Sequence, residues 1–487
     1  MQKRTSNSLT LFSIIAIVSS FVLSCDVQPP LPYGPLPTPS QVAWQQMEMN
    51  MFCHFGPNTF SGNEWGDGTE AEDLFAPTQL DCHQWVAVAQ QAGMKGIILT
   101  AKHHDGFCLW PNPCSQHTVA QSSWRNGKGD VLKELSNACH EGQLAFGIYI
   151  SPWDRNDPTY GTPEYNQQFL ATLSSAHDHY GPIFEQWFDG ANGEGPNGKK
   201  QTYDWEKFNN LVLEKHPQAL IFSDIGPGCR WVGNESGAAG RTCWSTLDID
   251  GFTPGAGAPS TDTLNQGNRN GTHWIPAETD VSIRDGWFYR PSEHPKSLKT
   301  LLRIYYTSVG RNSLLLLNVP PDTRGLIPAE DSIRLVELRK ALNDIFAQNL
   351  LLRGTFISEH ARGRRFGTSH LTDQDYNTYY ATREGQTNDL IEVSFTQPVT
   401  FNRVVLQEYI PLGQRIERFH IEILDNDGKW KTVATETTVG YKRIVILPTL
   451  TTNGIRIFID QSRACPVLSE MGLYYDKYLT DSEVSNL

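Results

Sequence analysis

Residues 182–190 read Pro182-Ile183-Phe184-Glu185-Gln186-Trp187-Phe188-Asp189-Gly190. The apolar and β-prone residues up to Phe188 predict a short strand that is covered on both faces. A carboxylate at the end of such a strand packs poorly, but it is well placed for chemistry, because active sites of parallel α/β folds form at the carboxyl ends of strands. Asp189 is therefore the first candidate for a catalytic residue.

A helix followed by a strand recurs on both sides of this segment. Each predicted helix has apolar residues at helical spacing and ends at a glycine or a proline. The strands of these four units are expected at residues 96–100, 144–150, 182–190 and 219–223. Further strands are expected at residues 52–56, 242–249, 273–278 and 313–319. Successive units of this kind indicate a parallel sheet, and their total length favours a (β/α)8-like TIM barrel.

The pattern changes beyond about residue 350. Short alternating runs appear there, separated by turn residues such as those at 425–428. Regularly spaced short strands of this kind predict an antiparallel, all-β sandwich. We therefore expect a catalytic domain over residues 41–347 and a β-sandwich over residues 350–478.

The first 25 residues are predicted to be a lipoprotein signal peptide rather than part of the fold. Lys3 and Arg4 precede an apolar run at residues 9–23 that is short for a membrane span. Residues 22–25 look like a bacterial lipobox, with Cys25 as the lipidated residue, and a plain secretory signal is the alternative. The proline-rich residues 26–40 are predicted to form a tether. The expected location is the periplasm or the outer membrane of a Gram-negative bacterium.

The composition bears on the kind of ligand. A net charge of −13 argues against a nucleic-acid partner, which needs dense Lys and Arg. The 13 Trp, 17 Tyr and 22 Phe suit a neutral polyol, whose apolar ring faces stack on aromatic side chains. The cysteines that follow Cys25 show no Cys-x-x-Cys pair and no disulfide framework, although Cys108 and Cys114 are near enough in sequence to bridge a loop.

Polar and aromatic residues gather at the ends of five consecutive predicted strands. In chain order they are His54, Glu64-Trp65, Lys102-His103-His104-Asp105, Trp153-Asp154, Trp187 with Asp189, and Asp224. A barrel would bring these ends to one pocket. The adjacent His103 and His104 would diverge on an extended segment, so we expect neither a metal nor any other cofactor. Carboxylates in a pocket lined by Trp fit glycoside hydrolysis best.

Several of these blocks carry a resemblance to a known family. They are Met51-Phe52-Cys53-His54-Phe55-Gly56, Glu64-Trp65, Ala101-Lys102-His103-His104-Asp105-Gly106-Phe107, Trp187-Phe188-Asp189-Gly190 and Asn318-Val319-Pro320-Pro321. Over roughly residues 41–346 the chain resembles the α-L-fucosidases of glycoside hydrolase family 29. The resemblance implies a retaining mechanism on a (β/α)8-like barrel, often followed by a discoidin-like, galactose-binding sandwich.

The resemblance also implies roles for individual residues. It makes Asp189 the nucleophile. It places His54, Glu64, Trp65, His103 and His104 on the fucose hydroxyls. Trp153, Trp187 and Trp287 are further candidates for substrate contact, with Trp187 or a nearby aromatic residue suited to the 6-deoxy methyl group.

The acid/base residue has two candidates. Arg230-Trp231-Val232-Gly233-Asn234-Glu235 resembles the acid/base block of the family branch that acts on α-1,3 and α-1,4 fucosyl linkages, which favours Glu235. Glu278 is the alternative, because it ends a predicted strand and Trp287 follows nearby.

The expected function is that of an exported enzyme, anchored by lipid, that hydrolyses terminal α-1,3/1,4-linked L-fucose from branched oligosaccharides. One alternative is an α-L-fucosidase of broad linkage specificity. Another is a non-catalytic glycan-binding lipoprotein, against which the presence of both Asp189 and Glu235 argues. The oligomeric state stays open.

Overall fold

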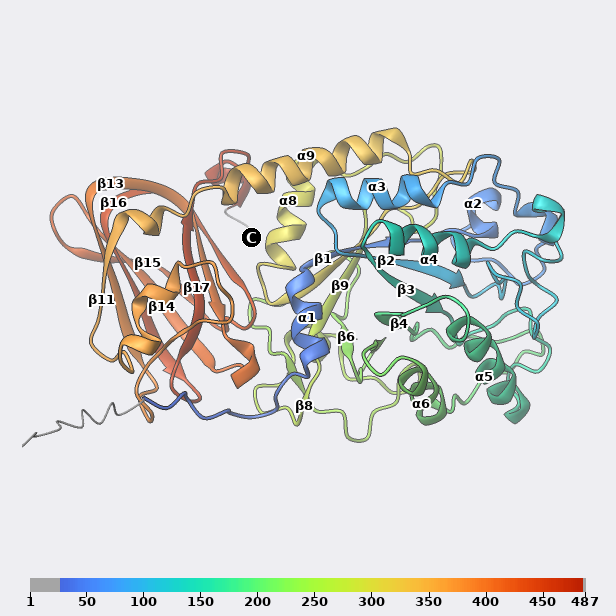
Figure 1. Ribbon diagram of the computed structural model, residues 1–487, viewed down its shortest axis with the longest axis horizontal. Helices are drawn as coiled ribbons and strands as arrows, with labels where there is room; N and C mark the ends of the chain where they lie inside the picture. The colour runs from blue at the N-terminus through green and yellow to red at the C-terminus, as the bar shows by residue number, and fades with distance from the viewer. Residues whose placement is uncertain (1–26, 485–487) are drawn as a thin grey trace, which may run out of the picture.

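The computed structural model describes residues 27–484, and within that range eight parallel strands close into a barrel (Figure 1). The barrel strands are β1 (Met49–Cys53), β2 (Gly96–Lys102), β3 (Ala145–Ile150), β4 (Glu185–Trp187), β5 (Leu220–Ser223), β6 (Cys229–Trp231), β9 (Ala277–Ser282) and β10 (Ser313–Asn318). Around the barrel their order is β1-β10-β9-β6-β5-β4-β3-β2. The predicted TIM-barrel architecture is confirmed.

Helices pack around the outside of this barrel (Figure 1). The longer ones are α1 (Pro39–Met47), α3 (Cys82–Ala92), α4 (Val131–Glu141), α5 (Pro163–His177), α6 (Trp205–Lys215), α8 (Leu298–Thr307) and α9 (Ala329–Phe346), and the short ones are α2 (Pro57–Ser61) and α7 (Thr261–Gln266). Local chemistry sets their ends. Asp81 caps α3 by accepting from the His83 and Gln84 amides, and Gly93 ends it in the left-handed conformation with φ of 76°.

The barrel core follows from the buried strands. Every residue of β1, β2, β9 and β10 is buried, as strands covered on both faces require. An inner cluster fills the barrel, and its buried members are Trp44, Phe52, Ile98, Tyr149, Trp187, Leu220, Phe222, Cys229, Leu314 and Leu316. Several aromatic rings of this cluster lie just below the carboxyl ends of the strands, so the core also forms the floor of the site described below.

Part of the barrel differs from the sequence expectation. The predicted strand at residues 242–249 lies outside the barrel, where β7 (Thr246–Leu247) pairs with β8 (His273–Trp274). The sixth barrel strand is instead β6, which the sequence places in a loop. Residues 224–228 alone connect β5 to β6, with no helix between them. A three-residue strand that contains an arginine shows no hydrophobic pattern in the sequence. Arg230 can nevertheless be buried, because its guanidinium donates to the carbonyls of residues 244, 264 and 275.

The C-terminal domain is an antiparallel sandwich, as predicted. Its strands are β11 (Gly354–Ser358), β12 (Tyr380–Ala381), β13 (Asp389–Glu408), β14 (Ile416–Leu424), β15 (Trp430–Glu436), β16 (Arg443–Ser462) and β17 (Val467–Tyr474). They follow the order β12-β17-β13-β16-β14-β15, and β11 pairs with β13. The two 20-residue strands β13 and β16 pair along most of their length, with register shifts after Ser394 and Phe401.

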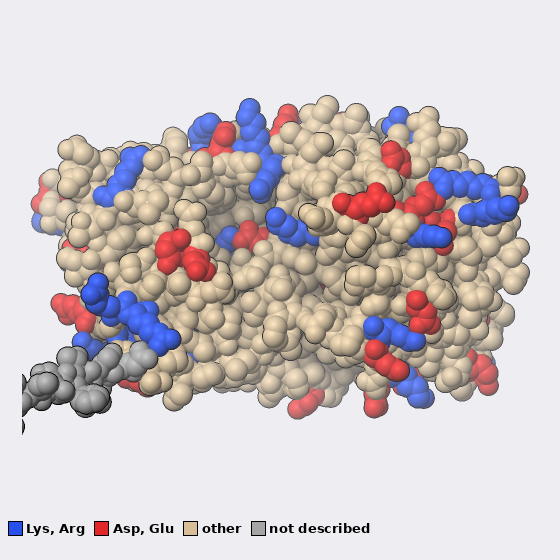
Figure 2. Space-filling view, viewed as in Figure 1, with Lys and Arg blue, Asp and Glu red and all other residues tan. Residues whose placement is uncertain are grey.

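The sandwich is attached to the barrel by partly buried polar contacts. Glu48, at the end of α1, accepts from the hydroxyls of Tyr305 and Tyr441 and pairs with Lys442. After the sandwich, α10 (Asp481–Val484) returns to the barrel, where the Glu483 carboxylate pairs with a lysine of α8. A cavity of about 420 Å³ remains between the domains and is visible as a hollow in Figure 2.

The segment predicted as a tether lies along the sandwich in its described part. The Tyr33 amide donates to the Leu412 carbonyl at 3.0 Å, and Arg415 donates to the Leu31 carbonyl at 2.6 Å. The predicted signal peptide and lipobox lie outside the described residues. Within residues 27–484, no helix combines the length and the apolar character that crossing a bilayer requires.

Candidate active site

A cavity of about 620 Å³ opens at the carboxyl ends of the barrel strands. It is lined by Phe52, His54, Glu64, Trp65, His103, His104, Tyr149, Trp187, Asp189, Ala191, Glu235, Asp280, Asp285, Gly286, Trp287, Arg290 and Glu293. Both predicted catalytic carboxylates are in this lining, as are seven of the eight predicted substrate contacts. Trp153 is the substrate contact that does not line it.

Asp189 follows β4 and is held by two hydrogen bonds. The Ala191 amide donates to its Oδ1 at 2.7 Å, and the Tyr149 hydroxyl donates to its Oδ2 at 3.0 Å. Burial raises the pKa of Asp189, and these two bonds oppose that shift because they favour the charged form. The side chain is 26% exposed, so the carboxylate is both fixed and accessible from the cavity.

His54 and His104 present defined nitrogen atoms to the cavity. Asn318 Nδ2 donates to the Trp287 carbonyl, so its Oδ1 accepts from His54 Nδ1–H at 3.0 Å. Ser151 donates its hydroxyl hydrogen to the Trp153 carbonyl, so its Oγ accepts from His104 Nδ1–H at 2.8 Å. Burial lowers the pKa of both histidines to about 3, so both rings are neutral and their Nε2 atoms are acceptors.

His104 Nε2 lies 3.8 Å from Asp189 Oδ2. His103 packs against His104, with ring centroids 4.2 Å apart, and its pKa is lowered well below the usual value by burial. The two adjacent histidines were expected to diverge, yet both line the cavity. They do so because residues 103–106 form a turn, closed by the Gly106 amide donating to the His103 carbonyl, and are not extended.

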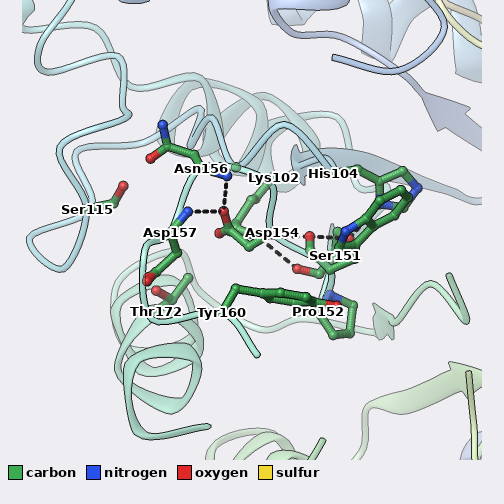
Figure 3. A network of polar contacts seen from close by, with 12 residues as sticks. Lys102, His104, Ser115, Ser151, Pro152, Asp154, Asn156, Asp157, Tyr160 and Thr172 are labelled. Carbon is green, nitrogen blue, oxygen red and sulfur yellow. Dashed lines mark hydrogen bonds and ion pairs between the residues drawn. The ribbon is translucent and has the colours of Figure 1, made fainter. Parts of the chain in front are cut away.

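A buried ion pair supports this corner of the site (Figure 3). Lys102 Nζ lies 2.9 Å from Asp154 Oδ2 and donates to the Ser151 carbonyl at 2.8 Å. Asp154 Oδ1 also accepts from the amides of Asn156 and Asp157. The pair therefore fixes the segment that carries Ser151, and through Ser151 the orientation of His104.

Trp153 stands behind the cavity wall. Its ring centroid is 4.8 Å from that of His104 and 5.8 Å from that of Trp65, and its Nε1 donates to the Glu194 carbonyl. Trp65 is 55% exposed and meets His104 edge-on at 5.7 Å. Trp153 thus supports two residues that line the cavity.

Glu235 enters the cavity from the exposed loop after β6. Trp287 Nε1 donates to its Oε2 at 3.3 Å. Burial and the nearby charge of Asp189 both raise the pKa of Glu235. A raised pKa favours the protonated form, which a general acid requires.

Glu64 joins two loops at the rim. Its Oε1 accepts from the Trp287 amide at 2.5 Å, and its Oε2 pairs with Arg290 at 2.7 Å. The loop after β1 and the loop after β9 are thereby linked. Both oxygens of Glu64 have protein partners, so this residue shapes the rim around Trp287 as well as lining the cavity.

Comparisons with known proteins agree with this geometry. The α-L-fucosidase family profile matches residues 33–344. The chain belongs to the α-L-fucosidase family, glycoside hydrolase family 29. The profile of the NedA-like, galactose-binding domain matches residues 370–457, within the sandwich of this α-L-fucosidase.

Similar proteins cover the chain almost completely. α-L-Fucosidase 1 of Arabidopsis thaliana is 42% identical over 474 residues, which span 96% of this chain and 93% of the relative. The crystal structure of SpGH29 superposes with a TM-score of 0.87 at 37% identity, covering 92% of this chain and all of the other. A Ruminococcus gnavus GH29 fucosidase in complex with fucose superposes with a TM-score of 0.85 at 29% identity, covering 93% and 97% of the two chains.

Sequence reasoning missed two buried residues that bring polar groups to the fucosidase cavity, Tyr149 and Asp280. Tyr149 lies within β3 between two isoleucines, so its sequence context is that of core, and no signal marks it. Asp280 lies on β9, and its Oδ1 accepts from Trp231 Nε1 at 3.0 Å. Burial and the charge of Glu235 raise the pKa of Asp280 well above the usual value. A carboxylate two residues beyond the predicted strand at residues 273–278 was the available signal.

Glu278, the alternative acid/base, is fully buried below the cavity and does not line it. It lies on β9 two residues before Asp280, on the same face of the strand but deeper in the barrel. Its Oε1 accepts from Trp187 Nε1 at 2.7 Å. Glu235, in contrast, lines the cavity together with Asp189.

All eight cysteines of the described part of the chain are unpaired, Cys108 and Cys114 among them. Among the described residues, one group has ligand atoms near enough together to hold a metal ion. It consists of Glu185, Cys229 and Glu278, whose ligand atoms lie within 4.8 Å of one another beneath the cavity.

Proposed function

We propose that this fucosidase releases terminal α-1,3/1,4-linked L-fucose from branched oligosaccharides with retention of configuration. α-L-Fucosidase activity follows from its family. The observation that carries the finer proposal is that Asp189 and Glu235 line one cavity with neutral histidines and tryptophans. Retaining glycosidases need one ionised and one protonated carboxyl group at such a site.

Asp189 is assigned as the nucleophile. The hydrogen bonds from Ala191 and Tyr149 orient its carboxylate and favour its charged form. In the first step, one oxygen of Asp189 attacks the anomeric carbon, and the bond to the leaving oxygen breaks. The product is a glycosyl ester on the enzyme.

Glu235 is assigned as the acid and then the base. In the first step its proton passes to the leaving oxygen. In the second step the Glu235 carboxylate takes a proton from water, whose oxygen attacks the anomeric carbon and releases Asp189. The loop position of Glu235 lets it face both the leaving group and the incoming water.

The remaining lining residues fit a deoxy sugar. His54 and His104 offer acceptor nitrogens to sugar hydroxyls, and the indole of Trp187 offers an apolar surface to the 6-deoxy methyl group. A buried polar group that loses its hydroxyl partner is costly, so sugars that lack a matching hydroxyl are rejected.

A second cavity of about 310 Å³ supports a saccharide as leaving group. It shares Asp189 and Glu235 with the first and continues over Trp231, Pro259 and Asp224. Its aromatic and polar lining suits a sugar joined to fucose. The block that contains Trp231 and Glu235 is the one that resembles the branch acting on α-1,3 and α-1,4 linkages.

Product analysis by NMR tests this proposal. We expect α-L-fucose as the first product, and faster turnover of branched α-1,3/1,4-fucosylated trisaccharides than of simple aryl fucosides. β-L-Fucose as first product would refute retention. Efficient hydrolysis of aryl fucosides and of all linkages would identify a fucosidase of broad specificity, and binding without turnover would identify a glycan-binding protein.

We further propose that the enzyme is an exported lipoprotein anchored through Cys25. The support is the lipobox at residues 22–25 after a basic start and an apolar run. Expression of the full chain and of Cys25→Ala in a Gram-negative host tests this. The parent chain should partition into detergent and carry a lipid mass at Cys25, whereas an unmodified soluble parent chain would exclude the anchor.

A further inference from the structure

Trp187 forms part of the floor of the active-site cavity, and its polar edge points away from the cavity. Its Nε1 donates to Glu278 Oε1 at 2.7 Å, and Glu278 is fully buried. The indole stacks on Phe222, with centroids 3.8 Å apart and planes 7° from parallel. The hydrogen bond fixes the rotation of the ring within this stack, so the part of the ring that reaches the cavity is apolar.

The same ring also contacts the residue that holds Asp189. Trp187 stacks on Tyr149 with centroids 5.3 Å apart, and the Tyr149 hydroxyl donates to Asp189 Oδ2. A line of contacts therefore runs from Glu278 through Trp187 and Tyr149 to Asp189. A displacement of the Trp187 ring would therefore also displace Tyr149 and change the position of the Asp189 carboxylate.

Glu278 lies against a second buried carboxyl group. Glu185 is also fully buried, and one oxygen of its carboxyl lies within 4.8 Å of one oxygen of the Glu278 carboxyl. Glu185 Oε2 accepts from Trp44 Nε1 at 2.8 Å, just as Glu278 accepts from Trp187. Among the described residues, Glu278 Oε2 has no hydrogen-bond partner. One oxygen of each carboxyl therefore accepts an indole N–H. The oxygens that lie between the two carboxyls need a further hydrogen-bond partner.

We propose that Glu278 is a positioning residue of this fucosidase: protonated, and donating that proton to Glu185, it holds the Trp187 indole in place beneath the fucose. The inference rests on the proposed function, because it takes Trp187 as a contact of the bound sugar. It gives Glu278 a part in the reaction without contact to the reacting atoms.

Charge and burial support the shared proton. Two carboxylates in contact away from water cannot both stay ionised, because each destabilises the charge of the other. Burial first, and then Glu185, raise the pKa of Glu278 well above the usual value. Cys229 Sγ, 3.5 Å from Glu185 Oε1, contributes a thiol whose pKa burial also raises. One oxygen of each carboxyl already accepts an indole N–H. This arrangement suits a proton shared between the two remaining oxygens better than a bound cation.

Two substitutions of similar size at Glu278 test the proposal in the full-length enzyme. Glu278→Gln keeps an oxygen for the Trp187 N–H and gains an amide that donates to Glu185. We expect its kcat/KM to stay within about threefold of the parent enzyme. Glu278→Met removes the acceptor and leaves a buried N–H without a partner. We expect its kcat/KM to fall about 10- to 100-fold, with weaker inhibition by free fucose.

Trp44→Phe is the matched control. It removes the other indole N–H from the same carboxyl pair, but Trp44 lies on α1 and does not line the cavity. We expect Trp44→Phe and Glu278→Met to lower the melting temperature to a similar extent. Only Glu278→Met should change kcat/KM and the inhibition constant of fucose.

Several outcomes would overturn the proposal. An inactive Glu278→Gln that azide restores would make Glu278 the acid/base. Equal kinetics for Glu278→Met and Trp44→Phe would make the pair purely structural. A stoichiometric metal in the parent enzyme that Glu278→Gln loses would replace the shared proton with a cation. Failure of the proposed function differs from all three, because it would show in the parent enzyme itself, as β-L-fucose as first product, hydrolysis of all linkages or binding without turnover.

Discussion

The two halves of the barrel build the site in different ways. In the first half, β1 to β4, the functional side chains sit on or just after the strands, as His54, Tyr149 and Asp189 do. In the second half, β5, β6, β9 and β10, the cavity is completed largely by loops that carry Glu235, Trp287 and Arg290. His54, His104 and Tyr149 are buried, whereas Glu235 is exposed.

The difference suits the two tasks of a glycosidase. The sugar that is attacked must be held in one geometry, and side chains on strands are fixed by the sheet itself. The proton donor must reach both the leaving group and water, and a loop at the rim gives that access. We therefore expect substitutions in the first half to affect fucose recognition and the chemical step. The effect of substitutions in the second half on the rate should depend on the leaving group.

Asp189→Ala should have the largest effect. Loss of the nucleophile should lower kcat by about 10³-fold or more, while fucose binding, measured by calorimetry, is retained. Azide should restore turnover of activated fucosides and yield the β-fucosyl azide, because it attacks directly from the side of the missing carboxylate. Substantial activity without azide would contradict the assignment.

Glu235→Ala should come next, and its effect should depend on the leaving group. We expect a loss of about 10²-fold or more with oligosaccharides and a smaller loss with aryl fucosides, whose leaving groups need little protonation. Azide should accelerate the second step and give the α-fucosyl azide. If azide restores Glu278→Ala instead, the acid/base is Glu278.

The pH profile tests the same pair of carboxyls. Activity of the parent enzyme should fall at low pH as Asp189 is protonated, and at high pH as Glu235 loses its proton. Because the pKa values of both groups are raised, both limbs should lie above those of free carboxyls. In Glu235→Ala the alkaline limb of kcat/KM for aryl fucosides should disappear.

Ser151→Ala tests the support of the first half. It removes the acceptor that fixes the tautomer and the orientation of His104, and we expect kcat/KM to fall about tenfold. Ser308→Ala, which removes another buried serine hydroxyl at the end of α8, is the control for stability. Equal kinetics for the two variants would show that His104 does not need Ser151.

Arg290→Met should have the smallest effect. Arg290 and Glu64 are each about one-third exposed, and such ion pairs contribute little. We expect KM to rise about two- to fivefold, because the loop that carries Trp287 is less well held. Arg269→Met, which breaks a pair between the half-exposed Arg269 and Glu417 outside the cavity, should leave KM unchanged. A large loss of kcat in Arg290→Met would contradict a role limited to the rim.

The contrast between the halves also explains which elements could be predicted. In the first half, β2 and β3 follow helices capped by Asp81 and Asp130, and β4 follows α5, which begins at Pro163, so the positions of these strands are marked locally. In the second half, β6 has three residues and a buried Arg230, and β7 and β8 pair outside the barrel. Periodicity over a few residues does not distinguish these cases.

The sequence by itself determined the barrel, the sandwich and the blocks that carry Asp189, the histidines and Glu235. These features follow from local sequence patterns, which can be recognised without knowing which residues pack together in the fold. Only the tertiary structure decided that Tyr149 and Asp280 face the cavity and that Glu278 lies beneath it. The physical reason is strand register: Glu278 and Asp280 share one face of β9, and a displacement of two residues separates a buried carboxyl from one that lines the site.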